Sequence, residues 1–468
     1  MLKPLRIFIP VVLITLFLCC RSGTTENTTN PDSTESATNN DSTKATLNIK
    51  HPEWMLQGNI YEVNVRQYTP EGTFKAFARH LDRLKEMGVQ TIWFMPINPI
   101  SKKDRKGSLG SYYAVSDYTA INPEFGNLDD FKKLVREIHD KGMKVLIDWV
   151  PNHTGGDNRW LKSHPDFFVK DSTGQAAIAV DWADTRQLDY KNPEMQDSMI
   201  LAMKYWITNA DIDGFRCDVA WNVPAAFWQK CIPQLKSMKE IFMLAEGDKS
   251  YLPESGFDAV YPWTMFHTMG LVAKGERPAT SLDSIRQQND TLYPGNTMQL
   301  YFTSNHDENS WNKADFAKFP GAVHAPFAVF TQTMDDALPL IYSGQEEPVL
   351  RAIKFFDKDN MKFKNYKRAK FYDTLLELRS RNPALASDAS FRKLSVGNDK
   401  AVYAYTREKS GKKVFVILNL SGKEQTIVVK DADLQGKPNN VFMGTNEPLT
   451  SAPWKIQPWG YVVYEYGK

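Results

Sequence analysis

Short apolar runs alternate with helical patterns along most of the chain. One helical pattern starts at Phe74, where apolar residues recur up to Met87 at the i, i+3, i+4 and i+7 spacing of an amphipathic helix. Another is the final helix, expected at 367–381. The alternation predicts eight strand–helix units. The predicted strands lie at 60–65, 89–95, 143–150, 212–218, 241–246, 257–262, 298–304 and 337–342.

Alternating strands and helices indicate a parallel sheet. Eight units over roughly 330 residues predict a (β/α)8 barrel with insertions. An open doubly wound sheet is the alternative, but it ordinarily has fewer strands, and no Gly-x-Gly-x-x-Gly follows the first strand here. We place the barrel at 51–385, with a short loop-rich insertion at 151–192 after the third strand.

The pattern changes after Pro383, where short strands and turn residues replace the helical faces. This predicts a small antiparallel β-sandwich at 386–468. Its expected strands are Phe391–Val396, Ala401–Arg407, Lys413–Leu420, Gln425–Lys430 and Gly460–Tyr466.

The N-terminus has the pattern of an export signal. Lys3 and Arg6 precede an uncharged apolar run at 7–18, which is too short to span a bilayer as a helix. The cysteines that follow resemble the acylation site of a bacterial lipoprotein signal. We predict a signal peptide at 1–20 and a lipid anchor at Cys20, or at Cys19, with a plain cleaved signal as the alternative.

Residues 21–50 are rich in Ser, Thr and Asn and contain no aromatic residue. Such a segment buries too little apolar surface to offset the entropy lost on ordering, so we expect a disordered tether. The sequence therefore predicts an exported protein that is anchored to a membrane through its N-terminal lipid, on the periplasmic or cell-surface face.

Charge and cysteine content exclude other classes. The formal net charge is +2, from 57 basic and 55 acidic residues, so nucleic acid is not an expected partner. Four cysteines make no disulfide scaffold. Cys217 and Cys231 could form a bridge, but we expect two unpaired buried thiols. The 12 Trp, 19 Tyr and 26 Phe residues suit either a core or the stacking of ligands.

Four predicted strands end in carboxylates. Asp148, Asp218, Glu246 and Asp307 end the third, fourth, fifth and seventh strands. In a (β/α)8 barrel the strands' C-terminal ends form one rim, where catalytic residues lie. Carboxylates in apolar strands are costly unless they are paired or used. Their convergence therefore predicts an active site at this rim.

The spacing within the strands predicts different roles for two of these carboxylates. Arg216 and Asp218 share one face of their strand, while Phe215 and Cys217 face the helices. A guanidinium beside Asp218 should keep that carboxylate ionised, as a nucleophile requires. Glu246 has no basic neighbour in its own strand, so we expect its pKa to be raised, as a general acid requires.

The sequence blocks around these residues resemble the motifs of the α-amylase family, glycoside hydrolase family 13. The resemblance covers 52–468. The four central blocks are Asp148-Trp-Val-Pro-Asn152-His153, Gly214-Phe-Arg216-Cys-Asp218, Leu244-Ala-Glu246-Gly and Phe302-Thr-Ser-Asn-His306-Asp307. Further matches are Tyr113–Gly126, Gln187–Pro193 and Leu338–Glu346.

The resemblance implies retaining hydrolysis of mainly α-1,4 bonds in starch-like glucans or maltooligosaccharides, with no cofactor needed for the chemistry. Asp218 would be the nucleophile, Glu246 the acid and base, and Asp307 a ligand of sugar hydroxyls that favours the distorted ring. The implied substrate-binding residues are Tyr113, Asp148, His153, Arg216 and His306.

The roles implied for these binding residues are distinct. Arg216 would orient Asp218, the two histidines would bind hydroxyls, and Asp148 would brace that network. Tyr113 would stack on the sugar before the cleaved bond. Its neighbour Tyr112 is the alternative, although the spacing to Asp117 favours Tyr113.

Two departures from the family pattern leave the preferred bond and chain length open. Trp221-Asn222 stands where many relatives have Lys-His, and the insertion is short. The family's calcium ligand corresponds to Asn152, so a structural calcium is possible. The nearby acidic residues match no calcium loop in their spacing; they are Asp157, Asp166, Asp171, Asp181 and Asp184.

Two other functions compete with glucan hydrolysis. One is a pullulan- or cyclodextrin-cleaving enzyme, or an α-glucan transglycosylase, which would keep the same double displacement. The other is a starch-binding lipoprotein without turnover, which should lack a catalytic carboxylate. All three carboxylates are present, so we favour the hydrolase. The sequence does not distinguish endo from exo action.

Overall fold

A computed structural model describes residues 49–467, apart from the side chains of Ala314 and Asp315. The predicted signal peptide and its lipid anchor, Cys20 or Cys19, lie outside the described residues. The predicted tether does too, except for Ile49 and Lys50.

Eight parallel strands close into a barrel, in the order β1-β10-β9-β8-β7-β6-β3-β2. This confirms the predicted (β/α)8 fold. The strands are β1 Ile60–Val63, β2 Thr91–Phe94, β3 Lys144–Trp149, β6 Gly214–Cys217, β7 Phe242–Ala245, β8 Ala259–Val260, β9 Met298–Tyr301 and β10 Ala337–Tyr342.

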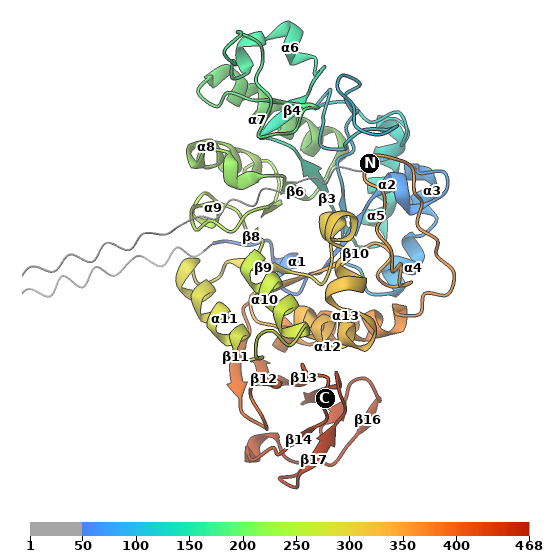
Figure 1. Cartoon of the computed structure of the whole chain (residues 1–468), viewed down its shortest axis with the longest axis vertical. Coiled ribbons are helices and arrows are strands. Elements are labelled where there is room, and N and C mark those ends of the chain that lie inside the picture. The colour runs from blue at the N-terminus through green and yellow to red at the C-terminus, as the bar shows by residue number, and fades with distance from the viewer. Residues whose placement is uncertain (1–48, 468) are drawn as a thin grey trace, which may run out of the picture. The chain divides into compact units, whose positions relative to one another are not determined.

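Helices surround the barrel (Figure 1). They are α1 Glu53–Leu56, α2 Val65–Tyr68, α3 Phe74–Ala78, α4 Leu81–Glu86, α5 Leu128–Asp140, α6 Trp160–Ser163, α7 Pro193–Ala210, α8 Ala225–Lys236, α9 Tyr251–Glu254, α10 Trp263–Ala273, α11 Ser281–Leu292, α12 His324–Thr333 and α13 Ala369–Arg381.

The helix predicted to start at Phe74 is two helices, α3 and α4. The chain tightens between them, where the His80 N–H donates to the Phe77 carbonyl, three residues back. The apolar face survives this break, since Phe74, Leu81 and Leu84 are all buried. The spacing therefore identified the buried side of this segment but not its interruption.

The insertion after β3 carries α6 and a two-stranded antiparallel pair, β4 His153–Gly155 with β5 Thr185–Gln187. In Figure 1 this teal and green region lies at the end of the barrel away from the C-terminal domain.

The C-terminal domain is an antiparallel β-structure, as predicted. A six-stranded sheet, β11-β12-β13-β18-β15-β16, is joined by the pair β14-β17. The strands are β11 Ser390–Leu394, β12 Val402–Lys409, β13 Lys412–Asn419, β14 Gln425–Ile427, β15 Asn439–Asn440, β16 Thr445–Asn446, β17 Trp454–Ile456 and β18 Tyr461–Tyr466.

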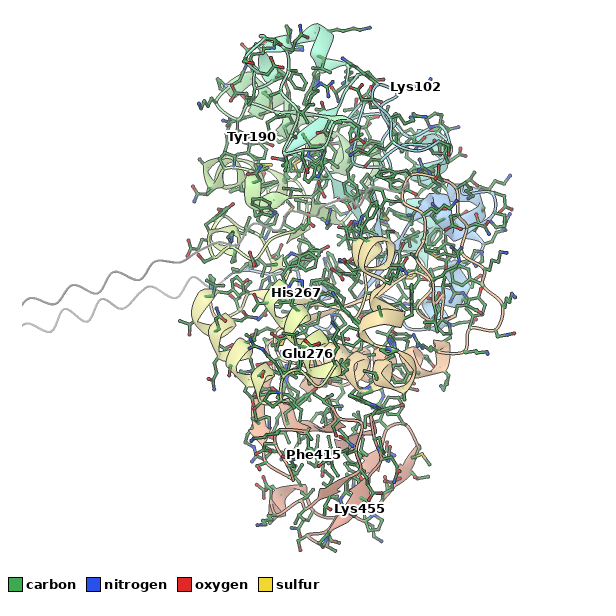
Figure 2. The ribbon with its side chains drawn as sticks, viewed as in Figure 1. Lys102, Tyr190, His267, Glu276, Phe415 and Lys455 are labelled. Atoms are coloured by element: carbon green, nitrogen blue, oxygen red, sulfur yellow. The ribbon has the colours of Figure 1, made fainter. Side chains whose placement is uncertain are left out.

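Strand β13 shows how this domain attaches to the barrel. Phe415, labelled in Figure 2, and Ile417 belong to the domain's own core. Val414 and Val416 face the other way and join the core that includes Phe330 of α12. This period-two alternation lets one sheet pack on both of its faces.

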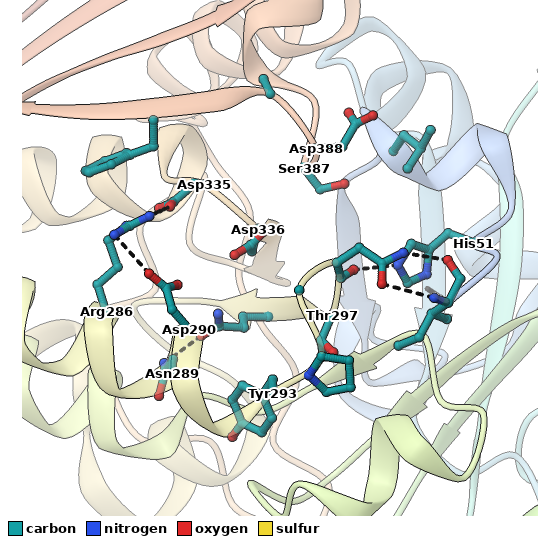
Figure 3. Close-up of a pocket in the computed structure, with 18 residues that line it drawn as sticks. His51, Arg286, Asn289, Asp290, Tyr293, Thr297, Asp335, Asp336, Ser387 and Asp388 are labelled. Carbon is teal, nitrogen blue, oxygen red and sulfur yellow. Dashed lines mark hydrogen bonds and ion pairs between the residues drawn. The ribbon is translucent and has the colours of Figure 1, made fainter. Parts of the chain in front are cut away.

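The N-terminal segment packs at the opposite end of the barrel from the predicted site. Ile49 exchanges two hydrogen bonds with Asn296, which precedes β9. His51 contacts Asp258, which precedes β8, at 3.1 Å. Figure 3 shows His51 at the edge of a cavity of about 580 Å³ that reaches the C-terminal domain at Asp388.

No helix within residues 49–467 has both the length and the apolar character needed to span a lipid bilayer.

Gly214 is where β6 approaches β7 most closely. Its φ is +154°, and a Cβ added there would lie 2.0 Å from the carbonyl oxygen of Phe242. We expect Gly214→Ala to destabilise the protein by about 3 kcal/mol, because packed backbone cannot move aside. Thermal unfolding measures this. Gly295→Ala is the control, since no atom lies within 4 Å of its added Cβ, and an equal loss in both variants would contradict the expectation.

Candidate active site

Arg216 lies at the centre of the predicted carboxylates and is buried. Its Nη1 is 2.9 Å from both Asp148 Oδ1 and Asp218 Oδ1. Its Nη2 is 3.3 Å from Glu246 Oε1. One guanidinium from β6 thus joins carboxylates from three adjacent strands, and the sequence predicted all four residues.

Strand register explains this convergence. Asp148 of β3 and Arg216 of β6 are direct partners across the sheet. The ladder continues past the strand ends, where the Asp218 N–H donates to the Trp149 carbonyl at 2.8 Å. The Glu246 N–H likewise donates to the Cys217 carbonyl at 3.0 Å. The backbone therefore holds both carboxylates at one rim.

Val219 follows Asp218 in a left-handed conformation, with φ of 46°. This backbone is costly for a β-branched residue and persists only where the surroundings enforce it. Its N–H donates to Glu246 Oε2 at 2.7 Å. The strained residue therefore fixes the position of Glu246 next to Asp218.

Burial dominates the protonation of this cluster. It raises the pKa of Asp148 to about 6, although Arg216 and His306 oppose the shift. Burial also raises the pKa of Asp218 well above its usual range, and Glu246 adds to this effect. Arg216 lowers the pKa of Asp218, as expected, but burial and Glu246 outweigh it in the ligand-free pocket. Glu246 has a basic neighbour after all, contributed by β6.

His306 is buried and contacts Glu62 of β1, with Nδ1 2.5 Å from Glu62 Oε1. Burial alone would lower the pKa of His306, but Asp307 and Glu62 overcome it and raise the pKa to about 9. His306 is therefore an imidazolium at neutral pH. Glu62 was not predicted from the sequence as a site residue, although it is a charged residue within the first predicted strand.

The structure separates the two adjacent tyrosines. Tyr113 lines the cavity, and its hydroxyl is 3.1 Å from Asp148 Oδ2 and 2.7 Å from His306 Nε2. Tyr112 is 1% exposed and lies under the Arg66 guanidinium, outside the cavity lining. Tyr113 is thus the tyrosine available for stacking.

Asp307 and His153 complete the predicted set, and both line the cavity. Asp307 is the most open of the carboxylates, with 35% of its side chain exposed. Burial lowers the pKa of His153 to about 4, so this imidazole is neutral. Its Nδ1 lies 3.2 Å from the Asn152 amide nitrogen, which leaves Nε2 to carry the proton.

The cavity over these residues measures about 480 Å³, within the range of ligand pockets. Trp182 lines it, whereas Trp149, next to Asp148 in the sequence, is fully buried. Other residues were not predicted from the sequence to line the cavity, because they do not lie at the ends of the barrel strands. These are Lys106, Ser111, Asp184, Trp311, Phe355 and Phe356.

The larger cavity in Figure 3 is at the other end of the barrel and holds none of the predicted site residues. Arg286 lies there between Asp335, at 2.6 Å, and Asp290, at 3.1 Å. The Arg286–Asp335 pair links α11 to the segment before β10, and Arg286 also lies over the Phe391 ring of the C-terminal domain, so we assign the chemistry to the smaller cavity.

The residues around Asn152 do not fit a calcium ion. Asn152 Oδ1 accepts hydrogen bonds from the amide groups of Asn222, at 2.9 Å, and Gln187, at 3.3 Å. Amide donors occupy the oxygen that calcium would need. Among the described residues, no three His, Cys, Asp or Glu side chains form a group that could hold a metal ion.

Cys217 and Cys231 are free and buried, as expected. Burial raises the pKa of both thiols. They are therefore packing residues and not nucleophiles.

Comparison with known families agrees with this site. The family described as "Alpha amylase, catalytic domain" matches residues 29–175 and 168–385. The "Alpha-amylase SusG C-terminal domain" matches residues 402–455. The chain therefore belongs to the α-amylase family.

Known members of the family are moderately similar to this chain in sequence. Alpha-amylase MalA of Haloarcula japonica is 26% identical over 82% of this chain, and Neopullulanase 2 of Thermoactinomyces vulgaris is 28% identical over 78%. The matches span 58% and 65% of those two proteins. The crystal structure of the maltogenic alpha-amylase AmyB from Thermotoga neapolitana has a TM-score of 0.80 at 26% identity. It covers 89% of this chain and 100% of that one.

The Glu62–His306 pair predicts a pH-dependent stability. The pKa of His306 is raised from 6.5 to about 9, so the stabilisation is complete below pH 6.5 and is lost as the pH rises through about 9. We expect Glu62→Gln to lower the unfolding temperature most below pH 6.5, and the difference from wild type to narrow above about pH 9.

Thermal unfolding across this pH range measures the difference. The exposed Glu254→Gln is the matched control and should show no such trend. A Glu62→Gln effect that is constant with pH would contradict the charged pair.

Proposed function

We propose that this protein is a retaining glycoside hydrolase that cleaves mainly α-1,4-glucosidic bonds in starch-like glucans or maltooligosaccharides. The observation that carries the proposal is the Arg216 guanidinium, which contacts both Asp218 and Glu246 at the base of a cavity. Two carboxyl groups on one guanidinium are neighbours, as are the nucleophile and the acid of retaining enzymes, which lie about 5 Å apart.

In the first step Asp218 attacks the anomeric carbon of the sugar bound against Tyr113. Glu246 donates its proton to the glycosidic oxygen as the C–O bond breaks, and a glycosyl ester forms on Asp218. In the ligand-free pocket burial raises the pKa of Asp148 to about 6 and that of Asp218 well above its usual range. During the reaction the proton has to lie on Glu246, and Arg216 stabilises the ionised Asp218.

In the second step Glu246, now ionised, takes a proton from water, and the oxygen of that water attacks the anomeric carbon of the glycosyl ester. Asp218 leaves as a carboxylate, and the sugar is released with its original α-configuration. The two displacements need no cofactor. The Val219 N–H bond to Glu246 keeps the acid and base in place through both steps.

The remaining residues bind the neutral sugar. Asp307, the most exposed carboxylate, accepts hydrogen bonds from hydroxyls. His153 offers a neutral N–H donor, and His306, braced by Glu62, holds the hydroxyl of Tyr113. A neutral polymer also suits a chain whose formal net charge is only +2.

A pullulan- or cyclodextrin-cleaving enzyme, or a transglycosylase, is the second candidate. Neopullulanase 2 and the Cyclomaltodextrinase of Thermoanaerobacter pseudethanolicus are among the similar proteins, at 28% and 27% identity. Incubation with amylose, pullulan and cyclodextrin, followed by separation of the products, distinguishes these activities. Transfer products that outnumber free sugars would contradict the hydrolase.

Asp218→Asn tests the mechanism. We expect hydrolysis of maltooligosaccharides to fall at least about 10³-fold, because the nucleophile is lost while the shape of the site remains. Glucan binding, measured by calorimetry, should persist. Asp181→Asn in the insertion is the matched control and should keep full activity. Hydrolysis by Asp218→Asn at the wild-type rate would disprove the mechanism, and no hydrolysis by the wild type would favour a binding protein.

We also propose that the protein is exported and anchored to a membrane by a lipid on Cys20. The support is the charged-then-apolar N-terminal pattern and the cysteines that follow it. Labelled palmitate should enter the wild type but not Cys20→Ala, which should move to the soluble fraction. A label that persists in Cys20→Ala but not in Cys19→Ala would move the anchor to Cys19, and no label in the wild type would favour a plain cleaved signal.

A further inference from the structure

A short segment between β2 and the insertion contributes Lys106 to the lining of the cavity. We call residues 102–109 the strap. Its beginning is tied to the insertion, because the backbone N–H groups of Lys102 and Lys103 donate to Asp157 Oδ2 at 2.8 and 3.1 Å. Lys102 is labelled in Figure 2, near the end of the molecule formed by the insertion.

Two ion pairs continue this attachment along the strap. Asp104 pairs with Arg186 of the insertion at 2.9 Å. Lys106 pairs with Asp184 at 3.0 Å, and both of these residues line the cavity. The first half of the strap is therefore fixed to one wall.

The second half of the strap is fixed to the opposite wall, the loop after β10. The backbone N–H and the hydroxyl of Ser108 both donate to Asp357 Oδ1, at 2.8 and 2.7 Å. The Leu109 N–H donates to the Phe356 carbonyl at 2.9 Å. At Gly107 an added Cβ would lie 2.5 Å from Phe356 Cβ, so the strap lies directly against this ring.

The strap lies on the side of the cavity away from the acid. Glu246 accepts a hydrogen bond from Val219, and the next residue, Gly247, lies against Trp221, which is 45% exposed. On the other side Tyr113 stacks on Phe355 at 6.1 Å, and Phe355 meets Phe356 at 5.2 Å. Phe356 in turn lies 6.0 Å below Lys106 Nζ.

These contacts assign the two sides of the cavity to the two parts of the substrate. Glu246 protonates the leaving group, so the aglycon extends past Trp221 into solvent. The sugars on the other side of the cleaved bond extend from Tyr113 towards Phe356 and the strap. A glucan that enters from the aglycon side therefore meets the strap at its non-reducing end.

We propose that the strap closes the glycon end of the cavity and makes the enzyme act from the non-reducing ends of its substrates, releasing short products of defined length. This inference rests on the proposed hydrolase function. An enzyme that cuts inside chains needs the polymer to extend out of the site on both sides of the cleaved bond. Because the strap is attached to both walls, the polymer cannot extend out on the glycon side.

Asp184 and Lys106 give the closed end a chemical preference. Asp184 Oδ1 pairs with Lys106, while its Oδ2 is buried and has no hydrogen-bond partner among the described residues. A sugar hydroxyl can donate to that oxygen, and Lys106 can donate to a second hydroxyl. The terminal sugar carries a free 4-hydroxyl that an internal sugar lacks. A site built to bind a hydroxyl discriminates strongly against its absence.

Paired substrates test this inference. Maltoheptaose is compared with the same oligosaccharide blocked at its non-reducing end by a 4,6-O-ethylidene group. We expect cleavage of the blocked form to be on the order of 100-fold slower or more. Comparable cleavage of both would overturn the inference but leave the hydrolase proposal intact. Cleavage of neither would instead refute the hydrolase proposal on which it rests.

Loosening the strap tests its part in this discrimination. Asp357→Ala removes the acceptor of both Ser108 bonds and should raise the relative rate on the blocked substrate about tenfold, with Ser108→Ala as a milder variant if Asp357→Ala unfolds. Lys103→Ala is the matched control, because only its backbone holds the strap. A ratio unchanged from wild type in a folded Asp357→Ala protein would show that the strap is not the barrier.

Discussion

The buried guanidinium of Arg216 is the interaction on which the site depends. Three carboxylates converge on it from adjacent strands, and without it they would be like charges in a medium that solvates them poorly. Breaking such a group by removing one partner typically costs about 3–5 kcal/mol. The same side chain therefore stabilises the cluster and lowers the pKa of Asp148 and Asp218 against the larger effect of their burial.

The barrel supplies the precision that this arrangement needs. Asp148 and Arg216 are partners in the sheet, and Asp218 and Glu246 are held by backbone hydrogen bonds that extend the ladder. Loops supply the rest of the cavity. Val219 links the two parts, because it follows Asp218 at the strand end and its N–H donates to Glu246.

Much of this could be predicted from the sequence. Periodicity identified the eight strands, and the rule that barrel chemistry lies at strand ends identified Asp148, Asp218, Glu246 and Asp307. What failed depends on contacts between distant segments. The pKa of Asp218 depends on its burial and on Glu246 of the next strand, which the spacing within one strand does not reveal. Trp149 follows the pattern of a rim residue, yet its neighbours enclose it completely.

Loop residues were the hardest to predict, because loops carry no periodicity. Phe355 and Phe356 reach the cavity from the long connection between β10 and α13, and Trp311 from a short π-helical segment that follows Asp307. Glu62 was missed for another reason: a single glutamate in an apolar strand has no local partner, and its histidine lies 244 residues away. The catalytic residues could therefore be predicted where they lie on regular strands. The shape of the cavity that receives the substrate could not, because the connections between the strands form much of it.

Two hydrogen bonds between Ile49 and Asn296 determine where an N-terminal anchor would join the folded protein. They fasten the N-terminal segment to the ends of the strands opposite the carboxylates. If Cys20 carries a lipid, the anchored segment joins the folded protein at the end of the barrel opposite the carboxylates. Bulky glucan granules could then be trimmed without the membrane competing for the same face, and the products would be set free close to the cell surface.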